Sequence, residues 1–125
     1  MKFELTLPPT LNHSYGVTNH RGGRSYMYKR SDAKAWQREA RLDIYQQLGK
    51  VETITDPVKI VMELYLKHNR DIDSSHKLLL DTLEYAQIIK NDKQIIDLHT
   101  KKFYGEKRNP KKLTKLVVYV DSTSN

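Results

Sequence analysis

Apolar and polar residues alternate along the start of the chain, Met1 to Pro9, with three apolar side chains on one side: Phe3, Leu5 and Leu7. This period of two predicts a β-strand with one buried face, because successive side chains of a strand point to opposite faces. The segment Val58 to Lys67 alternates in the same way. The segments Gln94 to Tyr104 and Leu113 to Val120 read as a strand pair, joined by the loop Gly105 to Lys112.

A helical period follows in the region of the single tryptophan. Ser31 or Asp32 can cap a helix that runs to about Leu48, and Gly49 suits its C-terminal stop. Trp36 is one of several apolar residues that recur at helical spacing, so we interpret it as a core residue rather than a ligand-binding one. That apolar face comprises Ala33, Trp36, Ala40, Ile44 and Leu48.

A second helix is expected to begin near Asp73 or Ser74 and to carry an apolar stripe inward: Leu79, Leu80, Leu83 and Ala86. Before the first helix, the glycine-containing segment Asn12 to Arg24 predicts an exposed loop or loose hairpin, with Ser25 to Lys29 as a short strand. The sum is an α+β fold in one small domain, residues 1–125. We expect a mixed four- to five-stranded sheet with two helices packed on one face, and a frayed tail over residues 121–125.

Composition limits the class of protein. A chain of 125 residues suits one domain with a modest core. Cysteine is absent, so disulfides and thiolate metal sites are excluded. No run is apolar enough for a signal peptide or a membrane span, and a cytoplasmic location is expected.

The net charge of +7 is concentrated in two clusters with interleaved aromatics. The first comprises Arg21, Arg24, Lys29, Arg30, Lys34, Arg38 and Arg41, and the second Lys101, Lys102, Lys107, Arg108, Lys111, Lys112 and Lys115. Either cluster alone could be an ordinary solvated face. Together they favour nucleic-acid binding, because basic side chains neutralise phosphates and aromatics stack on bases.

Between the clusters lies a small acidic group. Asp71 and Asp73 follow an apolar strand, and a spacing of two on a strand puts both carboxylates on one face, about 7 Å apart. Mg²⁺ prefers hard oxygen ligands and is usually held by a few carboxylates together with substrate phosphates. The pattern therefore predicts a metal site that acts on a polyanion.

Each of these residues also has an ordinary explanation. Asp73 could cap the second helix, Lys77 could pair with Asp81 one turn on, and Asp92 could be a turn residue. The five histidines show no zinc-like spacing, and of these His76 alone is near the acidic group in sequence. Asp71 is the hardest to dismiss, since its charge lies beside that of Asp73 and the two repel unless a cation intervenes.

The arrangement Arg70-Asp71-x-Asp73-x-x-x-Lys77, followed by Asp81, Asn91-Asp92 and Ile95-Ile96-Asp97, resembles the RusA-type Holliday junction resolvases. The opening Leu7-Pro8-Pro9-Thr10-Leu11-Asn12 and the loop Arg21-Gly22-Gly23-Arg24 are similar to that family too. Ser74 is a departure, because the family usually carries Asn there.

The resemblance implies that Asp71, Asp73 and Asp92 bind Mg²⁺, with Mn²⁺ as an expected substitute, and that Lys77 assists catalysis. It also implies a homodimer that places symmetric nicks in four-way DNA junctions. The residues expected to contact DNA are Asn12, Arg21, Arg24, Lys29, Arg30, Arg70, Lys77, Lys101, Lys107, Arg108, Lys111 and Lys112.

Helix length adds a geometric expectation. A helix over residues 74–87 would be roughly 21 Å long, and Asp92 follows it closely, so Asp92 and Asp73 would lie at opposite ends. A two-fold dimer with antiparallel helices would reunite them, which predicts metal sites shared between subunits. Two alternatives remain: a non-catalytic basic nucleic-acid-binding module, and a flap- or fork-specific nuclease with the same metal site.

Overall fold

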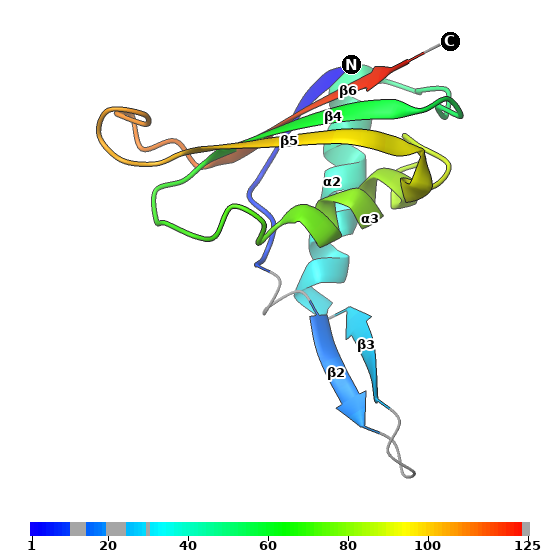
Figure 1. The fold of residues 1–125 in the computed structure, drawn as a ribbon, viewed down its shortest axis with the longest axis horizontal. Coiled ribbons are helices and arrows are strands. Elements are labelled where there is room, and N and C mark those ends of the chain that lie inside the picture. The colour runs from blue at the N-terminus through cyan, green and yellow to red at the C-terminus, as the bar shows by residue number, and fades with distance from the viewer. Residues whose placement is uncertain (11–14, 20–24, 30, 124–125) are drawn as a thin grey trace.

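A mixed β-sheet and two helices form the body of the protein (Figure 1). The computed structural model describes residues 1–10, 15–19, 25–29 and 31–123, and for the two middle segments the backbone only. Along the chain the elements are β1 (Lys2–Leu5), β2 (Tyr15–Asn19), β3 (Ser25–Lys29), α2 (Ser31–Leu48), β4 (Val58–Tyr65), α3 (His76–Tyr85), the short 3-10 helix η1 (Asp92–Gln94), β5 (Ile95–Phe103) and β6 (Lys115–Ser122).

The main sheet has four strands in the order β1-β6-β4-β5. β6 runs antiparallel to both of its neighbours, whereas β4 and β5 run parallel. In the centre, Ile60 of β4 lies opposite Val120 on one side and Leu98 on the other. β2 and β3 form a separate antiparallel hairpin, so the expected short strand at Ser25 to Lys29 is confirmed.

Both helices lie on the same face of the main sheet, as Figure 1 shows, and the hydrophobic core lies between these two layers. The predicted mixed sheet with helices on one face is therefore confirmed. The alternating apolar residues of β4 are fully buried and lie on that face: Val58, Ile60, Met62, Leu64 and the following Leu66, each at most 1% exposed.

The predicted pairing of the last two strands is wrong. β5 and β6 are not neighbours, because β4 lies between them and pairs with both. A parallel pair needs a crossover connection, and here the segment that contains α3 provides it. The remaining connection, from β5 to β6, must therefore pass over the end of β4.

Several element boundaries also differ from the expectation. β4 ends at Tyr65 rather than Lys67, and α3 begins at His76 because the residues before it form turns. In those turns the Asp71 carbonyl accepts from the Ser74 N–H. At the C-terminus, β6 extends to Ser122, so residues 121 and 122 are not part of a frayed tail, and residues 124 and 125 lie outside the described residues.

The first helix matches its prediction at both ends. α2 spans Ser31–Leu48, and Gly49 ends it with a left-handed φ of 72°. Trp36 is buried, and its indole N–H donates to Thr6 of the first strand segment. Neither helix is long and apolar enough to cross a membrane within the described part of the chain.

Candidate active site

The segment between β4 and α3 carries the first two candidate aspartates and is fastened to the end of β5. The Leu66 N–H donates to the Phe103 carbonyl at 3.0 Å, which extends the parallel pairing by one residue. Lys102 Nζ then donates to Asn69 Oδ1 at 2.9 Å and to the Arg70 carbonyl at 3.2 Å. The backbone immediately before Asp71 is thus positioned by a lysine of the neighbouring strand.

Arg70 connects this segment to the N-terminal part of the chain. Its Nη1 donates to the Pro8 carbonyl at 2.7 Å and lies 3.4 Å from the Ser75 hydroxyl oxygen. Partial burial lowers the pKa of the Arg70 guanidinium, but arginine remains charged at neutral pH. The arginine that precedes Asp71 in sequence is therefore anchored to the N-terminal part of the chain through Nη1.

Asp71 and Asp73 lie in the exposed turns before α3. The residue that caps α3 is Ser75, without a side-chain capping bond, so the interpretation of Asp73 as a helix cap is wrong. Among the described residues, none hydrogen-bonds to either carboxylate. Beside them, the Ser74 hydroxyl is buried and has no hydrogen-bond partner among the described residues. The carboxylates are therefore available for a ligand from outside the chain.

His76, the first residue of α3, was noted in the sequence only for its nearness to the acidic group, and its contact with the sheet was not predicted. Its Nε2 lies 2.6 Å from the Thr100 hydroxyl of β5. Burial lowers the pKa of His76 from the ordinary 6.5, and the nearby charge of Asp73 raises it in part. The imidazole is thus neutral at pH 7 and ties the start of α3 to the sheet. A single histidine with no motif offers no sequence signal for such a contact.

Asp92 lies at the other end of α3. It begins η1, whose cap is Asn91, and Gln94 closes a capping box with the Asn91 backbone. The Glu84 carboxylate accepts from the Asp92 N–H, which fixes η1 to the last turn of α3. Since α3 has ten residues, about 15 Å of helix separates Asp92 from the Asp73 end.

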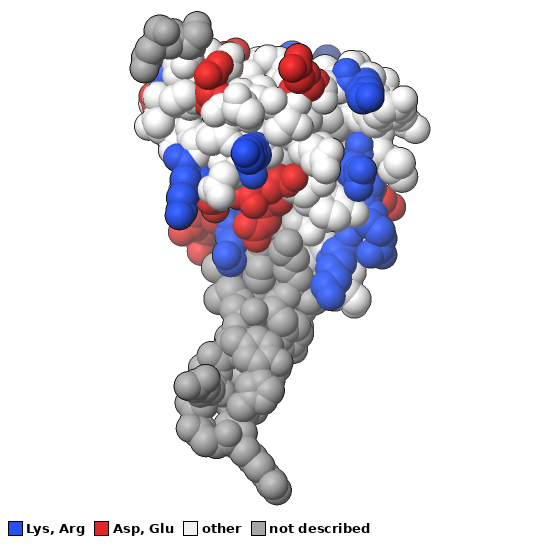
Figure 2. Space-filling model, turned by 90° about the vertical axis from the view of Figure 1, so that its right-hand side faces the viewer, with Lys and Arg blue, Asp and Glu red and all other residues white. Residues whose placement is uncertain are grey.

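One chain therefore does not bring the three aspartates together. Within the described residues, no group of three or more acidic, histidine or cysteine side chains could hold a metal ion. Figure 2 shows acidic side chains flanked by basic ones on the side of the molecule where α3 ends and η1 begins. The chain thus presents acidic groups at both ends of one helix.

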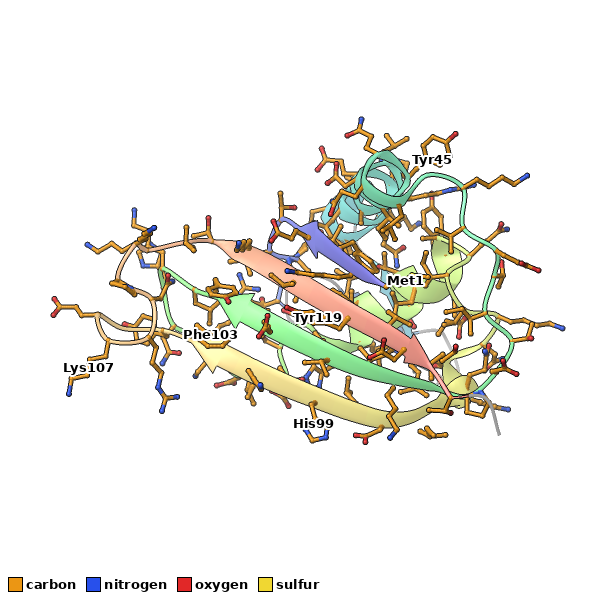
Figure 3. All side chains as sticks on the ribbon, turned by 90° about the horizontal axis from the view of Figure 1, so that it is seen from above. Met1, Tyr45, His99, Phe103, Lys107 and Tyr119 are labelled. Atoms are coloured by element: carbon orange, nitrogen blue, oxygen red, sulfur yellow. The ribbon has the colours of Figure 1, made fainter. Side chains whose placement is uncertain are left out.

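The predicted DNA-contact residues divide into three groups. Lys107, Arg108, Lys111 and Lys112 are exposed in the loop between β5 and β6, and Figure 3 shows Lys107 projecting at its tip. Lys77 is exposed in the first turn of α3, and Lys101 is exposed on β5, opposite Glu63 of β4. Apart from Arg70, whose contacts are given above, the others are outside the described residues (Asn12, Arg21, Arg24 and Arg30) or have only their backbone described (Lys29).

The basic loop and the Asp71 segment are joined by one buried side chain. Asn109 is 4% exposed, and its Nδ2 donates to the carbonyls of Leu66 and Leu113 while its Oδ1 accepts from the Leu113 N–H. Because Leu66 directly follows β4 on the way to Asp71, the loop is held at the same end of the sheet as the two aspartates. The structure thus brings these charges of opposite sign to one end of the molecule.

A hollow in the surface lies elsewhere. It has a volume of about 650 Å³, is bounded by the C-terminal parts of α2 and α3, and contains Arg41 stacked over the Tyr85 ring at 5.6 Å. Its lining includes no aspartate or glutamate, so it is not the acidic site.

The sequence was also compared with known proteins. The family model of endodeoxyribonuclease RusA matches residues 7–112, which span every candidate metal-binding residue and the basic loop. No curated protein matches the chain.

Proposed function

The chain belongs to the RusA endodeoxyribonuclease family, and we propose that it resolves four-way DNA junctions by paired symmetric nicks that require Mg²⁺. As an endodeoxyribonuclease it hydrolyses phosphodiester bonds within DNA, so a non-catalytic binding module is excluded. One observation carries the proposal: Asp71 and Asp73 are exposed, without hydrogen bonds from described residues, and they follow a backbone segment that Arg70 and Lys102 hold in place.

The side chains at this place fit a hard divalent cation. Mg²⁺ is commonly bound by one or two carboxylates, with phosphate and water oxygens completing its octahedral shell. Asp71 and Asp73 supply such carboxylates from an exposed turn. When bound, the ion would polarise the scissile phosphate and make a water more acidic. We propose Asp92 as the third ligand, and Mn²⁺, which accepts the same oxygen ligands, as a substitute.

The chain's own cations would bind and orient the DNA strand. Arg70 and Lys77 flank the two aspartates in sequence. The neutral imidazole of His76 can donate or accept a hydrogen bond without adding a positive charge. Lys107, Arg108, Lys111 and Lys112 of the β5–β6 loop would neutralise backbone phosphates farther along the same strand, a contribution independent of sequence.

A complete site requires a second copy of the chain. About 15 Å of helix keeps Asp92 away from Asp73 in one protomer, whereas a two-fold axis that sets two α3 helices antiparallel places the partner's Asp92 beside Asp71 and Asp73. We therefore propose a homodimer with two shared metal sites, which also accounts for two symmetric nicks.

Mixing two inactive variants tests this proposal. Asp71→Asn and Asp92→Asn homodimers each lack a ligand in both sites. A heterodimer has one site with both substitutions and one intact site, so it is expected to nick one strand of a labelled junction. If junction, Mg²⁺ and verified subunit exchange give no nicking above either parent, the sharing of sites is wrong.

Substrate choice is tested in the same assay with flap and duplex DNA. We expect the four-way junction to be cut fastest and cutting to stop in EDTA. Preferential cutting of the flap would reassign the chain to a flap- or fork-specific nuclease, and cutting that persists in EDTA would reject the metal requirement.

A further inference from the structure

The hollow bounded by the C-terminal parts of α2 and α3 has walls that the fold holds in place. Each helix is followed by one residue in the left-handed region: Gly49, at φ 72°, after α2, and Gln87, at φ 59°, after α3. The Thr53 hydroxyl donates to the Gln87 carbonyl at 2.8 Å. The Ile54 N–H donates to the Ile88 carbonyl at 2.9 Å. The chain that leaves α2 is thus fastened to the chain that leaves α3, and the hollow exists before any ligand binds.

Apolar side chains line this hollow, and several of them are exposed. Ile44 and Ile88 are buried lining residues. Leu42 and Tyr45 line it as well and are each 63% exposed, the highest fraction for a large apolar residue in the described part of the chain. Figure 3 shows Tyr45 projecting from α2 beyond the edge of the sheet. Exposed apolar side chains gathered in one place are typical of a surface that another molecule covers.

The charged side chains that line the hollow are all basic: Arg38, Arg41 and Lys50. All three are exposed. The Arg41 guanidinium lies over the Tyr85 ring, 5.6 Å from its centroid, which places a cation directly beside the apolar surface. Glu39 and Asp43 stand between these cations in the sequence, but neither lines the hollow. The hollow therefore combines apolar surface with positive charge that no lining carboxylate neutralises.

The positive charge alone has an ordinary explanation. Basic side chains near the C-terminal end of a helix offset the negative end of its dipole. That explanation does not account for Leu42 and Tyr45, because exposed apolar side chains contribute nothing to the dipole. The combination of the two features, rather than either one, indicates a binding site.

We propose that the hollow binds a short acidic segment of another protein. One large apolar side chain of that segment enters the hollow, and neighbouring carboxylates contact Arg38, Arg41 and Lys50. The volume of about 650 Å³ is within the range of pockets that bind small ligands, and it suits a single anchoring side chain with its flanking backbone. The site is separate from the proposed metal site, and neither proposal depends on the other.

A carboxylate matches the lining better than a nucleobase does. Arginine and lysine side chains only donate hydrogen bonds, and an ionised carboxylate only accepts them. A base also presents donors on its edges, and the lining has no carboxylate to accept from them. Burying such donors against Ile44, Val51 and Ile88 would leave them without partners, which is costly.

The position of the hollow also separates it from the proposed DNA surface. β4 and β5 run parallel, and the hollow is lined by segments that precede them. The basic loop follows the end of β5, so the two features lie at opposite ends of the sheet (Figure 1). The DNA backbone, moreover, offers no large apolar group that would cover Leu42 and Tyr45.

Calorimetry with synthetic peptides tests the proposal. The probes are three unlabelled decapeptides, each with six aspartates around a single Leu, Phe or Trp. At low salt, at least one is expected to bind the full chain with a Kd below about 100 µM. Replacing its aspartates with Asn, or its apolar residue with Ser, should each weaken binding at least about tenfold. Failure of all three peptides to bind, or equal binding of the Asn and Ser versions, would overturn the proposal.

Charge variants locate the binding on the chain. Arg41→Gln combined with Lys50→Gln is expected to weaken the best peptide at least about tenfold and to reduce the salt dependence of its affinity, because two opposite charges are removed. The matched control neutralises two exposed lysines outside the hollow, Lys59→Gln with Lys90→Gln, and should change the affinity by less than about threefold. Equal losses in the two double variants would show nonspecific attraction to a basic protein and would contradict the site.

Apolar variants distinguish the other possible occupants. Leu42→Ser combined with Tyr45→Ser is expected to weaken the peptide at least about tenfold. The urea midpoint, the oligomeric state in sedimentation and junction cleavage should stay as in the native protein, because both side chains are exposed. A variant that dissociates into monomers would assign the hollow to contact between copies of this chain. A variant that binds the peptide normally but loses junction affinity would assign it to DNA, and either result would reject the proposal.

Discussion

The N-terminal end of α3 is open and charged, whereas its C-terminal end is closed by hydrogen bonds. Before α3, Asp71 and Asp73 lie exposed in turns, and the surrounding bonds hold the backbone but leave their carboxylates available. After α3, the Gln94 side chain closes the capping box of η1 and also donates to the carbonyls of Ile54 and Asp56. The first end therefore suits the metal site proposed above, while the second presents Asp92 from a hydrogen-bonded support.

The largest effect is expected at the open end. Asp71→Asn should lower junction cleavage by more than about a hundredfold, because a proposed metal ligand is lost. Junction binding should stay the same or tighten, since one negative charge near phosphates is removed. Single-turnover cleavage and an electrophoretic mobility shift without metal measure the two quantities.

A charge change far from the site is the control for that prediction. Asp121→Asn neutralises a carboxylate that is 76% exposed at the end of β6, and it should leave cleavage within about twofold of the native rate, as exposed substitutions usually do. An Asp71→Asn protein that binds poorly but still cuts would reverse the assignment.

The basic loop should affect binding rather than chemistry. Replacing Lys111 and Lys112 with Gln is expected to weaken junction binding at every sequence and to reduce the slope of log affinity against log salt by about 2, because each phosphate contact releases counterions. Titrations between low and moderate salt measure that slope. A weaker affinity with an unchanged slope would show that the loop does not contact phosphates.

Much of the fold could be predicted from the sequence, because periodicity reports directly on burial. The alternation in β4 and the helical spacing around Trp36 identified buried faces that the structure confirms. Periodicity carries no information on which strand is the neighbour, and the pairing of β5 with β6 was therefore wrong. Strand order depends on the crossover through α3, a tertiary property.

Site residues were predictable only where a motif marked them. Asp71 and Asp73 are marked by the motif and by resemblance, but the expected strand geometry is wrong: the structure places them in turns rather than on one face of a strand. Lys102, His76 and Asn109 had no such signal, because each acts through a single hydrogen bond or a few to residues far away in sequence. Such contacts exist only once β5 lies beside β4.

Asn109 provides a test of whether the β5–β6 loop positions the segment that leads to Asp71. Asn109→Ala is expected to lower the free energy of unfolding by about 1–3 kcal/mol, because the buried carbonyl of Leu66 and both backbone groups of Leu113 lose their partner. Urea denaturation measures this loss. Cleavage should fall as well, since Leu66 leads into the Asp71 turn. Full cleavage by a destabilised Asn109→Ala protein would show that the loop does not position the site.

Substitutions of Gln94, at the C-terminal end of α3, should lower the stability of the protein. Gln94→Ala removes the capping box and two donated hydrogen bonds, and is expected to cost about 1–2 kcal/mol of unfolding free energy. Gln94→Glu retains the capping acceptor and is expected to cost roughly half as much. Equal losses in the two variants, measured in urea, would assign the stabilisation to the donated bonds instead of the cap.

The smallest effect concerns the pH dependence of stability. Burial lowers the pKa of His76 in the folded protein from 6.5, so the unfolded chain takes up this proton more readily. The contribution of His76 is therefore complete above pH 6.5 and is lost as the pH falls through the lower folded-state pKa. In EDTA, wild type should lose more unfolding free energy between pH 7.5 and 5 than His76→Asn does. Asp73→Asn should enlarge that loss, because the nearby carboxylate raises the pKa of His76; parallel curves for all three proteins would contradict this coupling.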